Sequence, residues 1–109
     1  IVFSNAPLFY VEAVIELLGI ADLFDAVYSI ESVKFRAKPS AVGFRAVLAA
    51  ERLDPGTCIM VEDSLNNLRT AKRIGMRTVW ISRENKSPAY VDLRVRALAS
   101  LPRLVGALR

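Results

Sequence analysis

The chain has 109 residues, of which 53% are hydrophobic, and a formal net charge of +4 at pH 7. This length suits one domain or part of one. The absence of histidine excludes histidine bases, triads and metal ligands, and no apolar run of about 18 residues predicts a membrane helix. The mild positive charge favours a small phosphorylated ligand over nucleic acid, because no basic cluster is interleaved with aromatic residues.

The only cysteine, Cys58, excludes an internal disulfide and favours a reducing, cytoplasmic location. We expect it to be a small core residue within a buried strand. No charged and apolar leader precedes the first expected strand, so we expect no signal peptide.

The first half of the chain predicts two strands and two helices. A short strand over residues 1–4 is followed by a helix that begins at Pro7 and ends near Gly19. A second strand over 26–30 leads to a polar, basic loop over 31–38, and Ser40 can cap the next helix. Helical spacing predicts the buried faces as Val11, Val14, Ile15 and Leu18 in the first helix and Val42, Phe44, Val47 and Leu48 in the second.

The second half continues the alternation of strand and helix. A turn over 53–56 precedes a buried strand over 57–61, and a helix over about 66–74 ends at Gly75. A strand over 76–82, a loop, a fifth strand over 93–97 and a closing helix over 101–108 follow. The alternation predicts an α/β fold, a doubly wound, Rossmann-like parallel sheet with helices on both faces.

Two adjacent carboxylates, Glu62 and Asp63, directly follow the strand over 57–61. In an open α/β sheet, ligands bind at the carboxyl ends of the strands, and carboxylate oxygens suit Mg²⁺. A bound cation would also offset the cost of burying two carboxylates side by side. The plain alternative is a pair of solvated acids in a loop, one of which caps the following helix.

Two further polar features stand at predicted loops. Ser4 and Asn5 follow the first strand at the start of a helix, where a hydroxyl, an amide and backbone N–H groups suit a phosphate. Lys38 precedes Pro39, which disfavours a helical backbone at Lys38, and a lysine held at a ligand edge can neutralise phosphoryl oxygens. The plain alternatives are helix capping by Ser4 or Asn5 and a solvated loop lysine.

These features, in this order, resemble the haloacid dehalogenase-like phosphatase superfamily. Residues 3–6 (Phe-Ser-Asn-Ala), 37–40 (Ala-Lys-Pro-Ser) and 61–68 (Val-Glu-Asp-Ser-Leu-Asn-Asn-Leu) are similar to its motifs II, III and IV. The resemblance covers nearly the whole chain. Within the superfamily, the segments 23–25, 29–31 and 35–40 look closest to pyrimidine 5′-nucleotidases, although phosphoglycolate phosphatases share the same skeleton and remain an alternative.

The resemblance implies a role for each phosphate-binding residue. Ser4 would bind the transferring phosphoryl group, and Asn5 would help to shape that pocket. Lys38 would hold the phosphoryl oxygens and the nucleophilic carboxylate. Ser4 and Lys38 are therefore the expected catalytic residues of this chain.

The resemblance also implies a Mg²⁺ site. Asp63 would be a metal ligand, directly or through water, and Glu62 a second acidic support at the metal. Asn67 stands where many relatives carry a further acid and would lie just outside the ligands.

The superfamily's first motif, a strand ending in Asp-x-Asp, is absent from this sequence. In relatives the first Asp attacks phosphorus to form an aspartyl-phosphate, and the second acts as acid and base. The helical cap that selects the substrate, which lies between the first two motifs, is absent too, and the chain starts without Met at Ile1. The resemblance therefore implies the C-terminal part of a core domain, over residues 1–109, from a Mg²⁺-dependent phosphomonoester hydrolase.

Three expectations follow from the resemblance. Pyrimidine nucleoside 5′-monophosphates are the expected substrates, and residues 1–109 alone should be inactive. The polar side-chain atoms of Ser4, Lys38 and Asp63 should lie within about 10 Å of one another, the scale of one phosphate with its metal. The missing strand belongs between the strands over 1–4 and 57–61, so the chain should leave a gap there, pair the two directly or dimerise through them.

Two alternatives belong to other functional classes. A phospho-receiver signalling module also gathers acids, a hydroxyl residue and a lysine at one sheet edge, but its acid pair comes on the first strand and its lysine comes late. Here Lys38 precedes Glu62 and Asp63, which disfavours that alternative. A dinucleotide-binding fold is disfavoured because no G-x-G-x-x-G occurs. The sequence leaves the oligomeric state open.

Overall fold

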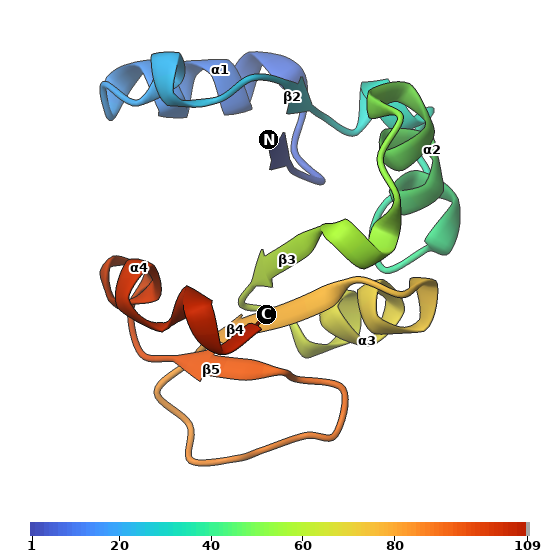
Figure 1. Ribbon diagram of the computed structural model, residues 1–109. Helices are drawn as coiled ribbons and strands as arrows, with labels where there is room; N and C mark the ends of the chain where they lie inside the picture. The colour runs from blue at the N-terminus through green and yellow to red at the C-terminus, as the bar shows by residue number, and fades with distance from the viewer. Residues whose placement is uncertain (109) are drawn as a thin grey trace. The chain divides into compact units, whose positions relative to one another are not determined.

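The computed structural model describes residues 1–108 (Figure 1). The chain divides into two compact units, one formed by Ile1–Ala49 and the other beginning at Ala50. None of the helices within residues 1–108 has the length and apolar character needed to cross a membrane.

The first unit contains a parallel sheet of two short strands. The register pairs Val2 with Val27 and Phe3 with Tyr28. In chain order, its elements are β1 (Val2–Phe3), α1 (Leu8–Leu17), a 3-10 turn (Ala21–Leu23), β2 (Val27–Tyr28), a second 3-10 turn (Glu31–Val33) and most of α2 (Ala41–Glu51).

Side chains from distant parts of the sequence hold the first unit together. The ring of Phe3 packs edge-on against Phe44 of α2, with ring centroids 5.4 Å apart. The Glu31 carboxylate accepts a hydrogen bond of 3.0 Å from the backbone N–H of Leu8, so a residue beyond β2 caps the N-terminus of α1. Pro7 stands just before α1, as its N-terminal cap residue.

The expected burial of α1 is largely wrong. Of the face predicted from helical spacing, Val11 is buried, Val14 and Ile15 are half-buried, and Leu18 is 63% exposed. The spacing identified the helix correctly, but this helix has too few apolar neighbours in its own unit to bury the face. The predicted burial is also wrong for Val42 of α2, which was expected in the core and is 51% exposed.

The second unit is built around a three-stranded parallel sheet with the order β3-β4-β5. In chain order, its elements are a 3-10 turn (Pro55–Thr57), β3 (Ile59–Glu62), α3 (Leu65–Ile74), β4 (Arg77–Ile81), β5 (Leu93–Val95), a 3-10 turn (Leu98–Ser100), α4 (Leu101–Leu104) and a last 3-10 turn (Val105–Leu108).

Strand β4 forms the centre of the second unit because it has a hydrogen-bonded neighbour on each side. Helix α3 packs on β3 and β4, and its Leu68 is fully buried. On the other face, Val79 forms a buried cluster with Val95 and Leu108, which come from β5 and the C-terminal turn. Figure 1 shows α3 and α4 on the two sides of this sheet, as expected for a doubly wound α/β fold.

The ends of α3 agree with their local sequence signals. The Ser64 hydroxyl accepts a hydrogen bond of 3.4 Å from the Asn67 N–H at the N-terminus. Gly75 ends the helix with a φ of 110°, a left-handed conformation that glycine adopts without steric cost.

The structure corrects two expectations about the strand over 57–61. The strand begins at Ile59, and Cys58 is a half-buried residue ahead of it whose thiol donates to the Asp54 carbonyl at 3.3 Å. Strand β3 is not fully buried either, since Ile59 is 41% exposed. The physical reason is that β3 is an edge strand, with β4 as its only neighbour among residues 1–108.

Strands β1 and β3 belong to separate sheets within residues 1–108. Each has one paired neighbour, β2 for β1 and β4 for β3. Direct pairing of β1 with β3, one of the three expected outcomes, therefore does not occur in the described part of the chain. A gap and dimerisation through these strands remain predictions.

Candidate functional site

The first unit brings Asn5 and Lys38 together through a pair of backbone-directed hydrogen bonds. The Asn5 side-chain oxygen accepts from the Lys38 N–H at 2.9 Å, and the Asn5 amide nitrogen donates to the Lys38 carbonyl at 3.1 Å. One side chain thus satisfies both polar backbone groups of a residue 33 positions away. This clamp fixes the backbone of Lys38 beside the loop that follows β1.

The ammonium group of Lys38 lies at the carboxyl end of β1. Its Nζ donates a hydrogen bond of 2.8 Å to the carbonyl of Phe3, the last residue of the strand, and lies 4.9 Å from the centroid of the Phe3 ring. Both contacts hold the Lys38 ammonium group at this edge. The structure therefore places the Lys38 ammonium group at the carbonyl of the residue before Ser4, and the phosphate-binding role of this edge stays a prediction.

Ser4 lies in the loop between β1 and α1. Its hydroxyl oxygen accepts a hydrogen bond of 3.1 Å from the backbone N–H of Ala6, and its own N–H donates to the Tyr28 carbonyl at 2.9 Å. The first contact is the local turn that any serine here can form. The hydroxyl hydrogen remains available as a donor toward an anion, so the turn and the phosphate interpretation are compatible.

In the second unit, Glu62 organises the loop that carries Asp63. One carboxylate oxygen of Glu62 accepts from the backbone N–H groups of Asp63 at 2.9 Å and Ser64 at 3.2 Å. The other accepts from the Asn67 side-chain amide at 2.7 Å. Glu62 is therefore bound into its own loop, and Asn67, which is 8% exposed, is the residue that orients it.

A tryptophan on the neighbouring strand β4 also binds this loop. The indole Nε1 of Trp80, which is 2% exposed, donates a hydrogen bond of 3.0 Å to the backbone carbonyl of Asp63. The register pairs Glu62 with Trp80, so the central strand β4 holds the acidic loop at the end of β3. Asp63 is thus held by its backbone on one side and by Glu62 on the other.

The acidic loop has oxygen donors of the kind that Mg²⁺ prefers. Asp63 and Glu62 offer hard carboxylate oxygens at the carboxyl end of a parallel strand, which suits the ion. Within residues 1–108, however, no group of three or more Asp, Glu, His or Cys side chains gathers to hold a metal. The loop therefore offers part of a Mg²⁺ ligand set, and the roles of Asp63 as a ligand and Glu62 as its support stay predictions.

The predicted site residues therefore fall into two groups. Ser4, Asn5 and Lys38 come together in the first unit, and Glu62, Asp63 and Asn67 come together in the second. The meeting of Lys38 with Asp63 within about 10 Å stays a prediction.

Comparison with known proteins identifies the family. Residues 1–75 match the sequence profile described as haloacid dehalogenase-like hydrolase. The chain belongs to this family. The superfamily predicted from the three motifs is therefore confirmed, while the finer resemblance to pyrimidine 5′-nucleotidases gains no support from the relatives below.

Two curated relatives of this haloacid dehalogenase-like chain are phosphatases by name. It is 29% identical over 102 residues to hexitol phosphatase B of Escherichia coli strain K12, covering 90% of this chain and 46% of the relative. It is 27% identical over 94 residues to validoxylamine A 7′-phosphate phosphatase of Streptomyces hygroscopicus, covering 86% of this chain and 44% of the relative. The chain thus spans about half the length of the curated relatives it matches.

Solved structures agree with the fold. A phosphatase of this superfamily from Thermococcus onnurineus matches with a TM-score of 0.74 and 32% identity, over 90% of this chain and 46% of that one. L-2-haloacid dehalogenase from Xanthobacter autotrophicus matches with a TM-score of 0.81 and 22% identity, over 94% of this chain and 53% of that one. The doubly wound α/β fold is therefore shared over part of the length of these proteins.

Sequence reasoning missed three positioning contacts. The Phe3 carbonyl that receives Lys38 carries no sequence signal, since any residue has one. Trp80 was expected only as a strand residue, and its indole bond to the Asp63 carbonyl depends on strand register. Gly43 has a packing role, because a Cβ there would lie 2.6 Å from the carbonyl oxygen of Arg36. This last contact could not be found without coordinates.

Proposed function

We propose that this chain supplies the phosphoryl-binding lysine and the acidic loop of a Mg²⁺-dependent phosphomonoester hydrolase. In this proposal the nucleophilic aspartate lies outside residues 1–109, because no Asp-x-Asp occurs in the sequence. The reaction is the hydrolysis of a phosphate monoester through an aspartyl-phosphate. The single cysteine supports a reducing, cytoplasmic setting for it.

The observation that carries the proposal is the double hydrogen bond between Asn5 and the Lys38 backbone, together with the bond from Lys38 Nζ to the Phe3 carbonyl. A solvated loop lysine needs neither contact. Holding a lysine side chain in one conformation costs about 1.5–2 kcal/mol of conformational entropy. The hydrogen bonds to Asn5 and Phe3 offset this cost and fix the cation at the end of β1. Preorganised charge at the place where negative charge develops is the largest common source of catalysis.

Each side chain then has a definite task. Lys38 Nζ neutralises phosphoryl oxygens and, with them, the charge on the attacking carboxylate. The Ser4 hydroxyl donates to another phosphoryl oxygen, and Asn5 keeps the lysine in register. Asp63 would hold the metal, while Glu62 and Asn67 keep the loop of Asp63 in its conformation. When bound, Mg²⁺ would supply charge neutralisation at the phosphoryl group and orient it for in-line attack.

The substrate is proposed as a phosphate monoester of a small polar metabolite. The resemblance of segments 23–25, 29–31 and 35–40 to pyrimidine 5′-nucleotidases implies a pyrimidine nucleoside 5′-monophosphate. The names of the curated relatives, hexitol phosphatase and validoxylamine A 7′-phosphate phosphatase, favour a polyol or sugar phosphate instead. A parallel assay of the intact protein on uridine 5′-monophosphate, sorbitol 6-phosphate and phosphoglycolate separates these classes by kcat/KM.

The function itself is tested on an intact protein that includes this chain. With Mg²⁺ and p-nitrophenyl phosphate, Lys38→Ala and Asp63→Asn should each lower kcat about a hundredfold or more, the scale of losing one preorganised electrostatic group. Lys86→Ala is the matched control, because Lys86 is an exposed lysine that pairs with Glu84 at 3.1 Å. It should turn over at the wild-type rate.

Full activity after Lys38→Ala would remove this lysine from the reaction. Equal losses in Lys38→Ala and in the Lys86→Ala control would point to general damage by charge removal. Activity that survives removal of divalent ions by chelation would contradict the metal part of the proposal.

A further inference from the structure

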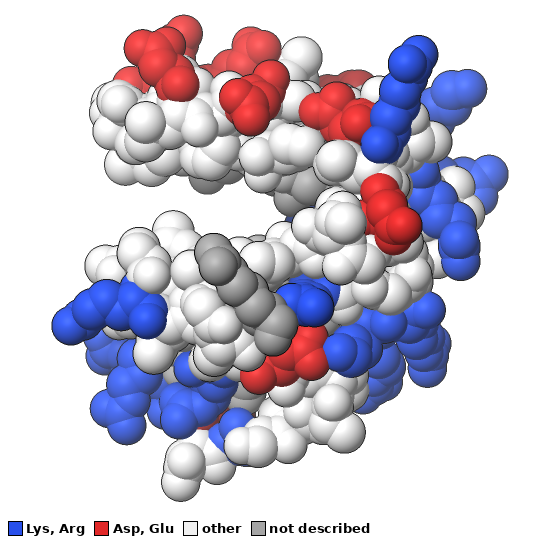
Figure 2. Space-filling model, in the orientation of Figure 1, with Lys and Arg blue, Asp and Glu red and all other residues white. Residues whose placement is uncertain are grey.

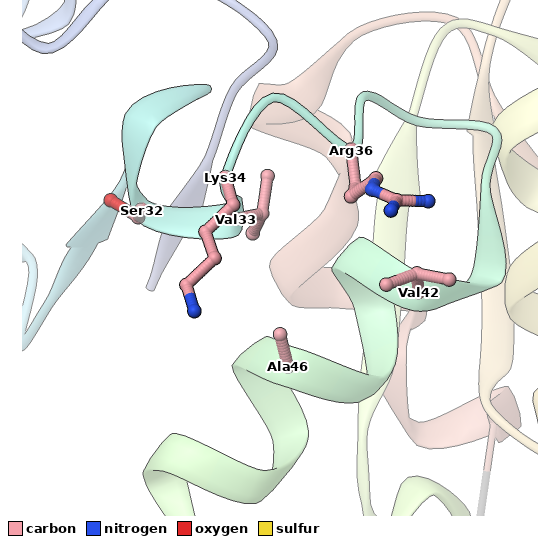
Figure 3. Close-up of a pocket in the computed structure, with 6 residues that line it drawn as sticks. All are labelled: Ser32, Val33, Lys34, Arg36, Val42 and Ala46. Atoms are coloured by element: carbon pink, nitrogen blue, oxygen red, sulfur yellow. The ribbon is translucent and has the colours of Figure 1, made fainter.

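A pocket of 520 Å³ lies in the first unit, between a tight turn and helix α2. The lining residues come from the 3-10 turn after β2, the segment that follows it and the exposed side of α2: Ser32, Val33, Lys34, Arg36, Val42 and Ala46. Figure 3 shows these side chains around the turn and the helix. Ser4, Asn5 and Lys38 do not line this pocket, so it is separate from the phosphoryl-binding residues.

The turn that carries the two cations has a strained and firmly held backbone. Lys34 and Phe35 are both left-handed, with φ of 53° and 61°. Non-glycine residues adopt this conformation at a cost and hold it only where surrounding contacts demand it. Three backbone hydrogen bonds of 2.9 to 3.1 Å hold the turn in this conformation. The N–H groups of Lys34, Phe35 and Arg36 donate them to the carbonyl oxygens of Glu31, Ile30 and Val33, respectively.

Helix α2 supports the turn from the other side. The Arg36 carbonyl oxygen lies so close to Gly43 that a Cβ at this glycine would be 2.6 Å from it. The backbone beneath both cations is therefore fixed against the helix before any ligand arrives. A prearranged site of this kind loses less entropy on binding than a flexible loop would.

The charges of the pocket are not compensated within the described part of the chain. Neither Lys34 nor Arg36 forms an ion pair with another of residues 1–108. The nearest acid in sequence, Glu31, is engaged with the N-terminus of α1 through the Leu8 N–H. Figure 3 shows the Lys34 and Arg36 side chains leaving the turn in different directions, with Arg36 above Val42 and Lys34 toward the Ala46 side.

The wall between the two cations is apolar. Val33 is 4% exposed and forms the base, while Val42 and Ala46 of α2 stay accessible. Val42 is 51% exposed although its spacing on α2 predicts a core residue. An inorganic ion would make no favourable contact with these apolar side chains, whereas the apolar body of an organic anion would bury them.

We propose that this pocket is a second binding site, which takes an organic anion with a small apolar body. The acidic group pairs with Lys34 or Arg36, and the body packs on Val33, Val42 and Ala46. Lys34 and Arg36 precede Lys38 by four and two residues, so occupancy would act on the same segment that delivers the catalytic lysine. The ligand differs from the substrate in needing no phosphoryl group.

The test is a titration of the chain, residues 1–109, followed by amide chemical shifts. Benzoate is the probe, benzamide is its neutral analogue, and acetate and inorganic phosphate are anions that lack the aromatic body. We expect benzoate to shift the amides of Lys34, Arg36 and Ala46, and to bind more tightly than each of the other three. Lys34→Gln and Arg36→Gln should each weaken benzoate about two- to fivefold, the scale of one exposed charge pair.

Arg45→Gln is the matched control, because Arg45 is an exposed cation on α2 that does not line the pocket. It should bind benzoate as the wild type does. Equal binding of benzoate and benzamide would overturn the role of charge, and equal binding of benzoate and phosphate would overturn the role of the apolar wall. Shifts centred on Asn5 and Lys38 instead would assign the anion to the phosphoryl-binding residues and refute a separate site.

Discussion

The two units of this chain are built from the same alternation of strand and helix but differ in how much they bury. The second unit has a central strand, β4, with a partner on each side and buried residues on both faces, among them Val79 and Trp80. The first unit has two strands of two residues each, and its helix α1 leaves Leu17 at 88% and Phe9 at 74% exposure. The spacing of apolar residues therefore predicts a helix or strand, while the number of neighbouring strands decides how much of its apolar face is buried.

The same contrast separates the two groups of predicted site residues, one in each unit. The acidic loop rests on β4 through the Trp80 indole, so it belongs to the well-packed unit. The lysine is held by polar contacts from Asn5 and Phe3 in the unit with the more exposed apolar side chains. We therefore expect substitutions elsewhere in the chain to alter the conformation of the acidic loop less than that of the lysine loop.

The largest expected effect is on the core of the second unit. Leu68→Ala removes a fully buried side chain that packs beneath the sheet and should lower the free energy of unfolding by about 2–5 kcal/mol. Leu17→Ala, its matched control on the exposed face of α1, should change it by less than about 0.5 kcal/mol. Urea denaturation followed by circular dichroism measures both. Equal losses would show that the exposed face of α1 is buried in solution and would break the comparison.

A smaller effect is expected at the close contact of the first unit. Gly43→Ala places a Cβ 2.6 Å from the Arg36 carbonyl and 3.3 Å from the Phe3 ring, so the turn and the lysine loop must shift. We expect a loss of about 1–3 kcal/mol, the usual range for overpacking. Gly106→Ala is the control, since a Cβ there meets nothing within 4 Å. Unchanged stability together with unchanged amide shifts at Lys38 would show that the turn is not held against α2.

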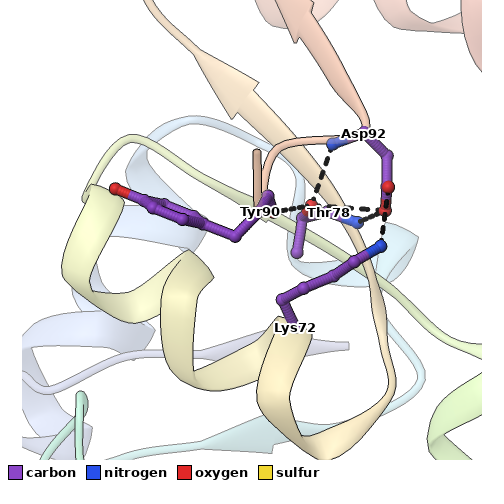
Figure 4. A network of polar contacts seen from close by, with 4 residues as sticks. All are labelled: Lys72, Thr78, Tyr90 and Asp92. Atoms are coloured by element: carbon purple, nitrogen blue, oxygen red, sulfur yellow. Dashed lines mark hydrogen bonds and ion pairs between the residues drawn. The ribbon is translucent and has the colours of Figure 1, made fainter. Parts of the chain in front are cut away.

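A third prediction concerns the polar network that fastens the loop before β5 to α3 and β4 (Figure 4). Asp92 accepts from the Thr78 N–H at 2.9 Å and pairs with Lys72 at 2.7 Å, while the buried Thr78 hydroxyl donates to the Tyr90 carbonyl at 2.6 Å. Partial burial raises the pKa of Asp92, but the hydrogen bonds and charge of Lys72, with the Thr78 amide, outweigh it and hold the pKa below its usual value.

A carboxyl group whose pKa is lowered by folding stabilises the fold at pH values above its usual pKa of 3.8. That contribution is lost as the pH falls through the lowered value. Asp92→Asn should therefore cost about 1 kcal/mol at pH 7, and the difference from wild type should shrink below about pH 4. The measurement is the urea midpoint of both proteins between pH 7 and pH 3. A difference that stays constant over this range would show that the charge of Asp92 has no part in the network.

An effect of similar size is expected at the end of α3. Gly75 has a φ of 110°, and a Cβ there meets Pro55 only at 3.9 Å, so Gly75→Ala costs conformational strain without a clash. We expect a loss of about 1 kcal/mol, seen as a shift of the urea midpoint. A substitution to Asn, which tolerates left-handed backbone better, should lose less than Ala. The reverse order would contradict the assignment of this residue as a left-handed helix end.

Local signals in the sequence were sufficient to predict most helices and strands, while the roles of the candidate site residues stay predictions. Ser64 and Gly75 mark the ends of α3 because capping depends on neighbours in the chain. Burial was predicted less well, as Leu18, Val42 and Ile59 show, because it depends on how many strands and helices lie alongside. The clamp of Asn5 on Lys38 joins residues 33 positions apart, and no local pattern encodes such a contact.

The central proposal is that this chain carries the phosphate-holding and metal-holding side chains of a phosphatase without its nucleophile. The most direct test is a turnover assay of the purified chain, residues 1–109, with Mg²⁺ and p-nitrophenyl phosphate. We expect no turnover above the buffer rate, because Lys38 and Ser4 can stabilise charge but the sequence contains no Asp-x-Asp to supply the nucleophile. Steady turnover that disappears in Asp63→Asn would contradict it, since the nucleophile would then lie within these residues.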